Sequence, residues 1–146
     1  MNRREFLSRI EGLSAGALAC GAGLSLNGCI GFHYVTTTVS GNRVLINKAE
    51  FGTGRFALVE APGFPLPLYL YRGDGGGYSA VSTRCTHRGC QVEPAAEHLI
   101  CPCHGSEYTN TGRVLKGPAQ RPLQQFPVEI EGEHIVIELP VGGEME

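Results

Sequence analysis

Two short segments that contain cysteine and histidine constrain this chain more than any other part of its sequence. They read C-T-H-R-G-C over residues 85–90 and C-P-C-H-G-S over residues 101–106. Each segment offers thiol and imidazole groups, together with a glycine that lets the backbone turn sharply. Thiolates and imidazoles are common metal ligands in proteins, so the sequence predicts a metal site formed by two loops.

The candidate ligands are Cys85 and His87 in the first loop and Cys101 and His104 in the second. Two thiolates and two imidazoles could hold a structural zinc ion in a tetrahedral site, which would leave one further cysteine in each loop without a role. A [2Fe-2S] cluster with two cysteines on one iron and two histidines on the other would take one ligand of each kind from each loop. The ligand types allow both metals.

The two loops, extended to C-P-C-H-G-S-x-Y in the second, resemble the two boxes of the Rieske proteins of cytochrome bc-type complexes. The resemblance covers about residues 44–139 and implies a [2Fe-2S] cofactor. It also implies a carrier of electrons that has no catalytic site of its own. By position, the implied roles are thiolate ligands at Cys85 and Cys101, imidazole ligands at His87 and His104, and a disulfide between Cys90 and Cys103.

Behind the second loop, Ser106 and Tyr108 match family residues whose hydroxyl groups donate hydrogen bonds to cluster sulfurs. Such bonds stabilise the reduced form, so we expect a potential toward the upper part of the range of about −150 to +300 mV. Gly117 and Pro118 resemble the start of the proline-containing loop that covers the cluster in the family.

Hydrophobic alternation and turn residues predict strands throughout the part that follows the N-terminal leader. The expected fold is all-β, a Rieske-type antiparallel β sandwich or small barrel, with a cluster-binding subdomain formed by two loops at hairpin tips. Residues 94–97 are expected to form a turn. The expected strands lie at residues 33–39, 43–46, 56–59, 68–71, 78–82, 97–100, 125–130 and 134–139.

The first 28 residues have the features of an export leader. Arg3 and Arg4 form a twin-arginine pair, and an uncharged, weakly apolar stretch follows, as in a Tat signal peptide. Residues 26–29 resemble a lipobox, in which Cys29 would be lipidated; otherwise the leader would remain as a membrane anchor. The expected location is the bacterial cell envelope, at the periplasmic face of the cytoplasmic membrane, where disulfides are stable.

The expected division of the chain follows from these features. Residues 1–28 are the signal or anchor, residues 29–42 a short linker and first strand, residues 43–140 the Rieske domain, and residues 141–146 a tail. The 146 residues leave no room for the second, iron-containing domain of a Rieske oxygenase. A net charge of −2 without a basic run argues against nucleic-acid binding.

The resemblance favours an electron-transfer subunit of a membrane-bound, quinol-oxidising cytochrome bc-like complex. Its partners would be cytochrome b and a c-type cytochrome, and His104 would contact quinol. The alternative is a lipid-anchored periplasmic electron carrier or a small subunit of another oxidoreductase, such as one of the arsenite-oxidase type. Arg88 favours the alternative because the bc-type family has an apolar residue there. A zinc module remains a third possibility.

Basic side chains are concentrated in and near the two loops. They could form a positively charged rim that meets an acidic or anionic partner, or they could be ordinary solvated charges. The residues are Arg84, Arg88, Arg113, Lys116 and Arg121.

Overall fold

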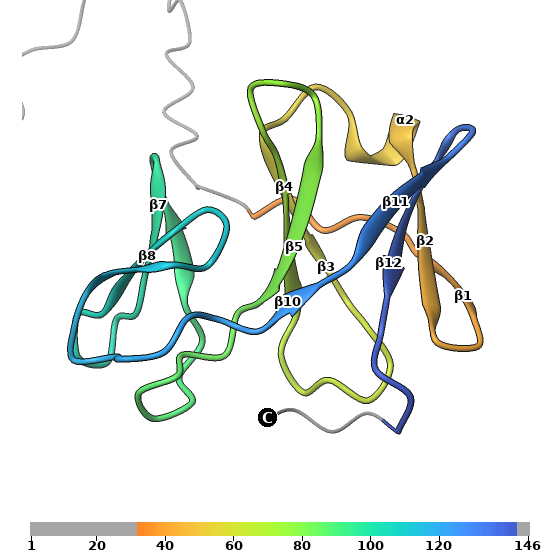
Figure 1. Ribbon diagram of the computed structural model, residues 1–146. Helices are drawn as coiled ribbons and strands as arrows, with labels where there is room; N and C mark the ends of the chain where they lie inside the picture. Colours follow the sequence, from red (N-terminus) through yellow and green to blue (C-terminus); the bar gives the residue numbers. More distant parts are fainter. Residues whose placement is uncertain (1–31, 143–146) are drawn as a thin grey trace, which may run out of the picture. The chain divides into compact units, whose positions relative to one another are not determined.

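The computed structural model of this protein describes residues 32–142. The leader, Cys29 and the end of the C-terminal tail lie outside this part. Within it the fold is all-β, as predicted, and consists of three four-stranded antiparallel sheets (Figure 1). Helix α2 (Lys48–Phe51) is a single turn. Between residues 32 and 142 no helix has the length and apolar character needed to cross a membrane.

Each sheet has a simple strand order. The first contains, in order, β1 (Thr38–Ser40), β2 (Arg43–Asn47), β12 (His134–Glu138) and β11 (Val128–Glu131). The second, which we call the central sheet, contains β10 (Gln125–Phe126), β5 (Tyr78–Ser82), β4 (Leu68–Arg72) and β3 (Phe56–Val59). The third, the small sheet, contains β6 (Glu93–Ala95), β7 (His98–Ile100), β8 (Glu107–Thr109) and β9 (Val114–Lys116).

The central sheet has one hydrophobic core on each face, as strand β4 illustrates. Leu68 and Leu70 belong to the core shared with the first sheet, whereas Tyr69 belongs to the core that contains residues of the small sheet. Side chains alternate between the faces of a strand, so a strand that is buried on both sides is apolar at successive positions. This explains the continuous run of apolar and aromatic residues in β4. Figure 1 shows the central sheet between the other two.

The strand expected over residues 125–130 is two strands in different sheets. Gln125–Phe126 pairs with β5 in the central sheet, and Val128–Glu131 pairs with β12 in the first sheet. Pro127 lies between them and has no N–H to donate to a continuous ladder. The expected closing hairpin is confirmed for β11 and β12, but the prediction of one unbroken strand was wrong.

The prediction of a turn over residues 94–97 was also wrong in part. Glu93–Ala95 forms strand β6, which pairs with β7, and the tight turn is confined to the residues that follow. Ala96 takes a positive φ of 50° there, which is uncommon for a residue with a side chain.

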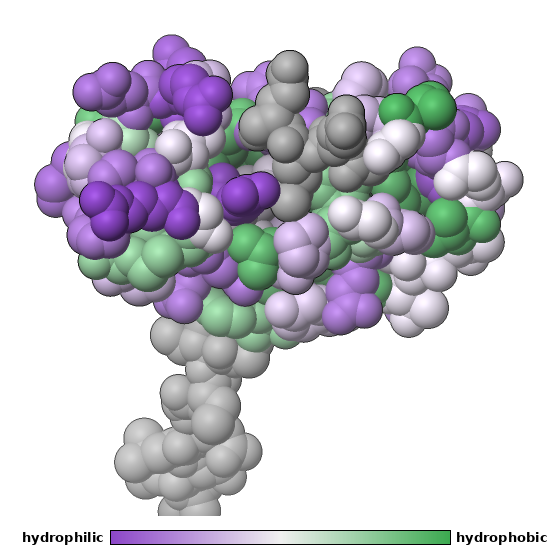
Figure 2. All heavy atoms as spheres, turned by 90° about the horizontal axis from the view of Figure 1, so that it is seen from below, coloured by the Kyte–Doolittle hydropathy of each residue, from purple (hydrophilic) through white to green (hydrophobic). Residues whose placement is uncertain are grey.

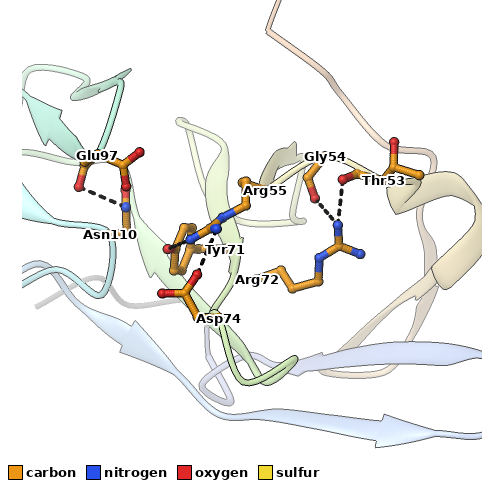
Figure 3. A network of polar contacts seen from close by, with 8 residues as sticks. All are labelled: Thr53, Gly54, Arg55, Tyr71, Arg72, Asp74, Glu97 and Asn110. Atoms are coloured by element: carbon orange, nitrogen blue, oxygen red, sulfur yellow. Dashed lines mark hydrogen bonds and ion pairs between the residues drawn. The ribbon is translucent and has the colours of Figure 1, made fainter.

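Several contacts join the small sheet to the central sheet, among them the hydrogen bond from Gln125 Nε2 to the Thr111 carbonyl at 2.7 Å. The chain leaves β5 for the small sheet and returns in β10, and these two strands pair with each other, with Val81 opposite Gln125. In addition, the Tyr69 hydroxyl donates to Asn110 Oδ1 at 2.9 Å, and Asn110 Nδ2 donates to the carbonyl of Glu97 at 3.0 Å. Figure 3 shows this last bond. Strand β4 is thereby linked to two turns of the small sheet.

Two arginines, Arg55 and Arg72, connect strand β4 with the turn that precedes β3, as Figure 3 also shows. Arg72 donates from Nη2 to the carbonyls of Thr53 and Gly54, at 2.6 and 2.7 Å. Arg55 donates to the Tyr71 hydroxyl at 2.6 Å and pairs with Asp74 at 2.8 Å. These contacts fix the turn before β3 against β4.

Candidate metal centre

The first loop is a tight turn closed by backbone hydrogen bonds. The Cys85 N–H donates to the Cys90 carbonyl, and the Gly89 N–H donates to the Cys85 carbonyl, both at 2.8 Å. Gly89 has a φ of +80°, a conformation that strains residues with a side chain. Arg84 and Gln91 pair as an isolated β-bridge at the root, so the loop is the tip of a short hairpin.

The second loop repeats this geometry. The Cys101 N–H donates to the Ser106 carbonyl at 2.8 Å, and the Gly105 N–H donates to the Cys101 carbonyl at 2.9 Å. Gly105 has a φ of +76°. This loop connects β7 to β8, so both loops are hairpin tips, as the sequence predicted.

A disulfide between Cys90 and Cys103 joins the two loops, with an S–S distance of 2.04 Å. The sulfurs of Cys90, Cys101 and Cys103 lie within 4.8 Å of one another. Because a disulfide offers no thiolate, these three sulfurs are not a ligand set. Their closeness shows instead that the bridge packs beside the free thiol of Cys101.

Cys85 and Cys101 are free thiols and are buried, with 2% and 1% of their surface exposed. The rings of His87 and His104 are neighbours, with centroids 4.9 Å apart and planes at 89°. His87 Nδ1 is buried and has no hydrogen-bond partner within residues 32–142, as expected for an atom that faces a metal. Two thiols and two imidazoles, one of each from each loop, fit the donor set of a [2Fe-2S] cluster of the mixed-ligand kind.

The two thiols are in different electrostatic surroundings. Burial raises the pKa of Cys85, but hydrogen bonds from Tyr108, Cys101 and the backbone of the first loop together outweigh it and leave that pKa below its ordinary value. Burial raises the pKa of the Cys101 thiol, and the neighbouring Cys85 raises it further. Of the two thiols, Cys85 therefore gives up its proton more readily.

Ser106 and Tyr108, expected to adjust the potential, are both completely buried beside the loops. Tyr108 Oη lies 3.2 Å from Cys85 Sγ. Ser106 Oγ accepts a hydrogen bond from the Ala119 N–H at 3.0 Å, so its own hydrogen remains available for another acceptor. Tyr108 thus lies within hydrogen-bond distance of a candidate ligand, and Ser106 has a hydrogen left to donate.

The segment expected to cover the site begins at Gly117 and Pro118, which are joined by a cis peptide bond. Pro118 and Arg121 line a hollow together with Thr86 and His87 of the first loop. This segment therefore lies beside one of the two imidazoles.

Thr86 was not predicted to have a role, although it connects three parts of the site. Its Oγ1 donates to the Arg121 carbonyl at 2.6 Å and lies 3.1 Å from Tyr108 Oη. Its N–H donates to the same Tyr108 oxygen at 3.3 Å. The only sequence signal would have been its position between two candidate ligands.

The sequence matches the family described as Rieske [2Fe-2S] domain over residues 35–127. Over 67 residues it is 46% identical to the cytochrome b6-f complex iron-sulfur subunit of Chlorobaculum tepidum, a match that covers 44% of this chain and 37% of that protein. Over 144 residues it is 33% identical to the subunit of the same name from Chlorobaculum thiosulfatiphilum, covering 92% of this chain and 74% of that one. The first match thus spans little more than a third of its relative.

A solved structure agrees with these sequence matches. The crystal structure of the cyanobacterial plasma membrane Rieske protein PetC3 from Synechocystis PCC 6803 superposes with a TM-score of 0.57 and 34% sequence identity. The superposition covers 69% of this chain and 99% of that one. Fold, loop geometry and sequence match therefore lead to the same conclusion: this chain belongs to the Rieske [2Fe-2S] domain family.

Proposed function

We propose that this protein carries single electrons on a [2Fe-2S] cluster, with Cys85 and Cys101 bound to one iron and His87 and His104 to the other. The observation that carries the proposal is that the two loops supply the same set of side chains. Each contributes one buried free thiol and one imidazole, while its remaining cysteine belongs to the disulfide. When bound, the cluster supplies one-electron oxidation and reduction.

The surrounding residues would determine how easily the site accepts an electron. Neutral imidazoles leave the site less negative than four thiolates would, which favours reduction. The hydroxyl groups of Ser106 and Tyr108 favour it further by donating toward sulfur. Together these features support the high-potential class.

The metal content of the purified full-length protein tests this proposal. We expect a coloured protein with two irons and two sulfides per chain and a [2Fe-2S] EPR signal after reduction. A colourless, EPR-silent protein that contains zinc would overturn the proposal and support the zinc module. Cys85→Ser and His87→Ala variants should each lose the native signal, whereas His134→Ala, which replaces an exposed histidine of β12, should keep it.

The donor and acceptor belong to the same proposal. We infer a subunit of a membrane-associated, quinol-oxidising cytochrome bc-like complex, with cytochrome b and a c-type cytochrome as partners. The relatives named as iron-sulfur subunits of the cytochrome b6-f complex support this role. His104 is exposed at the tip of the second loop, which supports it as the contact for quinol.

A second candidate is an electron carrier outside such a complex, or a small subunit of another oxidoreductase. Two observations favour it: Arg88 is exposed on the first loop, and the plasma membrane Rieske protein is matched over 99% of its chain. Purification from native membranes under mild conditions separates the two candidates. Co-purification with cytochrome b supports the first, and isolation without it supports the second.

We also propose that the protein is exported by the Tat route and held at the periplasmic face of the membrane, either by a lipid on Cys29 or by the uncleaved leader. The disulfide supports an oxidising destination. Arg3→Lys with Arg4→Lys should leave the protein in the cytoplasm. Mass spectrometry of the exported protein should show either an acylated Cys29 or an intact leader, and a Cys29→Ala variant distinguishes them.

A further inference from the structure

A polar pocket of about 260 Å³ is lined by the first loop together with residues of two neighbouring segments. Three arginines line it: Arg84, Arg88 and Arg121. The lining includes no carboxylate, and in the described part of the chain none of these guanidinium groups forms an ion pair. Three positive charges therefore share one hollow without a counter-charge.

Arg84 is held in place across the first loop. Its N–H donates to Ser82 Oγ at 3.1 Å, and its backbone forms the bridge to Gln91 at the root of the loop. Its side chain lies over Gly89, where an added Cβ would be only 3.2 Å from Arg84 Nε. The guanidinium group thus occupies a position that the glycine leaves open.

Arg121 lines the pocket from the segment after Pro118. The hydrogen bond from Thr86 Oγ1 to the Arg121 carbonyl fixes that segment to the first loop. The pocket is therefore lined by positive charge from two chain segments that are tied together. Ser82 and Gln124 add neutral hydrogen-bonding groups to the lining.

We propose that this pocket binds a tetrahedral oxyanion of the phosphate class. Guanidinium groups match phosphate oxygens with paired, charge-assisted hydrogen bonds, and a bound anion would relieve the repulsion among three like charges. Cys85 and His87 also line the pocket, so the anion would lie next to the metal centre. Because reduction adds negative charge, a bound anion would lower the reduction potential. This inference goes beyond the proposed role as a carrier.

Figure 2, which views the protein from below, shows strongly hydrophilic side chains gathered at the end that holds the small sheet. A polar surface of this kind suits a small solute better than an apolar ligand. A phospholipid headgroup carries the same kind of phosphate group, so the experiment separates free phosphate from lipid.

The test uses the full-length protein with its metal centre. Inorganic phosphate is added at constant ionic strength, and binding is followed by calorimetry and by an EPR-monitored redox titration. We expect saturable binding and a lower potential in the phosphate-bound protein. Arg84→Gln and Arg121→Gln should each weaken binding by about tenfold or more, because each removes a charge-assisted contact.

Arg113→Gln is the matched control, because Arg113 is exposed in the turn before β9 and does not line the pocket. It should change phosphate affinity by less than about twofold. An unaltered EPR signal in each variant shows that the fold and the metal centre are intact. The signal therefore reports on the proposed carrier role independently of phosphate binding.

The proposal is overturned if wild-type protein shows no saturable binding, or if the control weakens binding as much as Arg121→Gln. Vesicles of phosphatidylglycerol, compared with phosphatidylcholine, provide the lipid arm. Arginine-dependent binding of both phosphate and phosphatidylglycerol supports the site and adds a lipid source. Binding of vesicles without any binding of phosphate contradicts a site for the free oxyanion.

Discussion

The hydroxyl oxygen of Tyr108 lies 3.2 Å from the Sγ of Cys85, and both side chains are buried. The phenol hydrogen has a second acceptor within reach, Thr86 Oγ1 at 3.1 Å. The hydroxyl hydrogen of Thr86 is used on the Arg121 carbonyl, and the Thr86 N–H already donates to the Tyr108 oxygen. Tyr108 is therefore the donor to either acceptor, the Cys85 sulfur or Thr86 Oγ1, and a thiolate or cluster-bound sulfur, being charged, competes well for its hydrogen.

Removing that hydroxyl should lower the reduction potential. A sulfur that carries more negative charge accepts a stronger hydrogen bond, so the bond stabilises the reduced state more than the oxidised state. If the difference is about 1 kcal/mol, Tyr108→Phe lowers the potential by about 40 mV. Tyr78→Phe, which alters a half-buried tyrosine packed on Phe51, should leave the potential unchanged. An equal effect of both variants in a redox titration would contradict this prediction.

Ser106→Ala should affect both potential and stability. The substitution leaves the buried N–H of Ala119 without its acceptor, which costs about 1–3 kcal/mol of unfolding free energy. It also removes a hydroxyl that can donate toward the metal centre, so the potential should fall. Ser106→Thr keeps the oxygen and should retain part of the stability. Urea unfolding and a redox titration measure the two effects, and an unchanged urea midpoint for the alanine variant would disprove the first.

Replacing the disulfide by Cys90→Ala with Cys103→Ala should loosen the two loops without removing a candidate ligand. The bridge closes a loop with a sequence separation of 13, for which chain entropy predicts a loss of about 3 kcal/mol. We expect a lower denaturation midpoint and faster bleaching of the visible absorbance on mild heating. Bleaching at the wild-type rate would show that the loops hold their geometry without the bridge.

Asn110→Ala should weaken the attachment of the small sheet to β4. It breaks the bonds to Tyr69 and to the Glu97 carbonyl, and we expect a loss of about 1–2 kcal/mol. Tyr69→Phe removes one of the same bonds, so the double variant should lose less than the sum of the two single changes. Additive losses in urea unfolding would show that the two side chains act independently.

Stability should also fall at alkaline pH because of Tyr69. Burial, followed by the nearby Tyr71, raises the pKa of Tyr69 above its ordinary value. The neutral phenol is favoured in the folded state, so its contribution is complete below the unfolded pKa of about 10 and decreases as the pH rises above that value. Tyr69→Phe should show a smaller decrease in unfolding free energy between about pH 9 and pH 11. Equal slopes for the two proteins would contradict the assignment.

The sequence predicted the parts of the structure that depend on local patterns. The hairpin of β4 and β5 follows from two runs rich in apolar and aromatic residues on either side of a glycine-rich turn, and the two loops follow from cysteine, histidine and glycine spacing. The disulfide between Cys90 and Cys103 was implied by the family resemblance and is confirmed. The four ligand positions remain predictions, which the geometry of thiols and imidazoles supports.

The features that were missed depend on contacts between distant residues. Pro127 is visible in the sequence as an interruption, but the sequence does not say that the chain changes sheets there. Thr86 is an ordinary threonine until the fold brings Tyr108 and Arg121 to its hydroxyl. The pocket between Arg84 and Arg121 likewise requires the later segment to lie on the first loop. The local periodicity of a sequence contains no information about contacts between residues that are far apart in the chain.

The pairing of β5 with β10 has a consequence for how this architecture can diversify. Both cysteine loops, the small sheet and the covering segment form one uninterrupted stretch that leaves the central sheet after β5 and returns to it in β10. Because β5 and β10 are neighbours, the two ends of this stretch stay side by side whatever its length or sequence. A segment that carries all the candidate ligands can therefore be exchanged as one unit on the same supporting sheet.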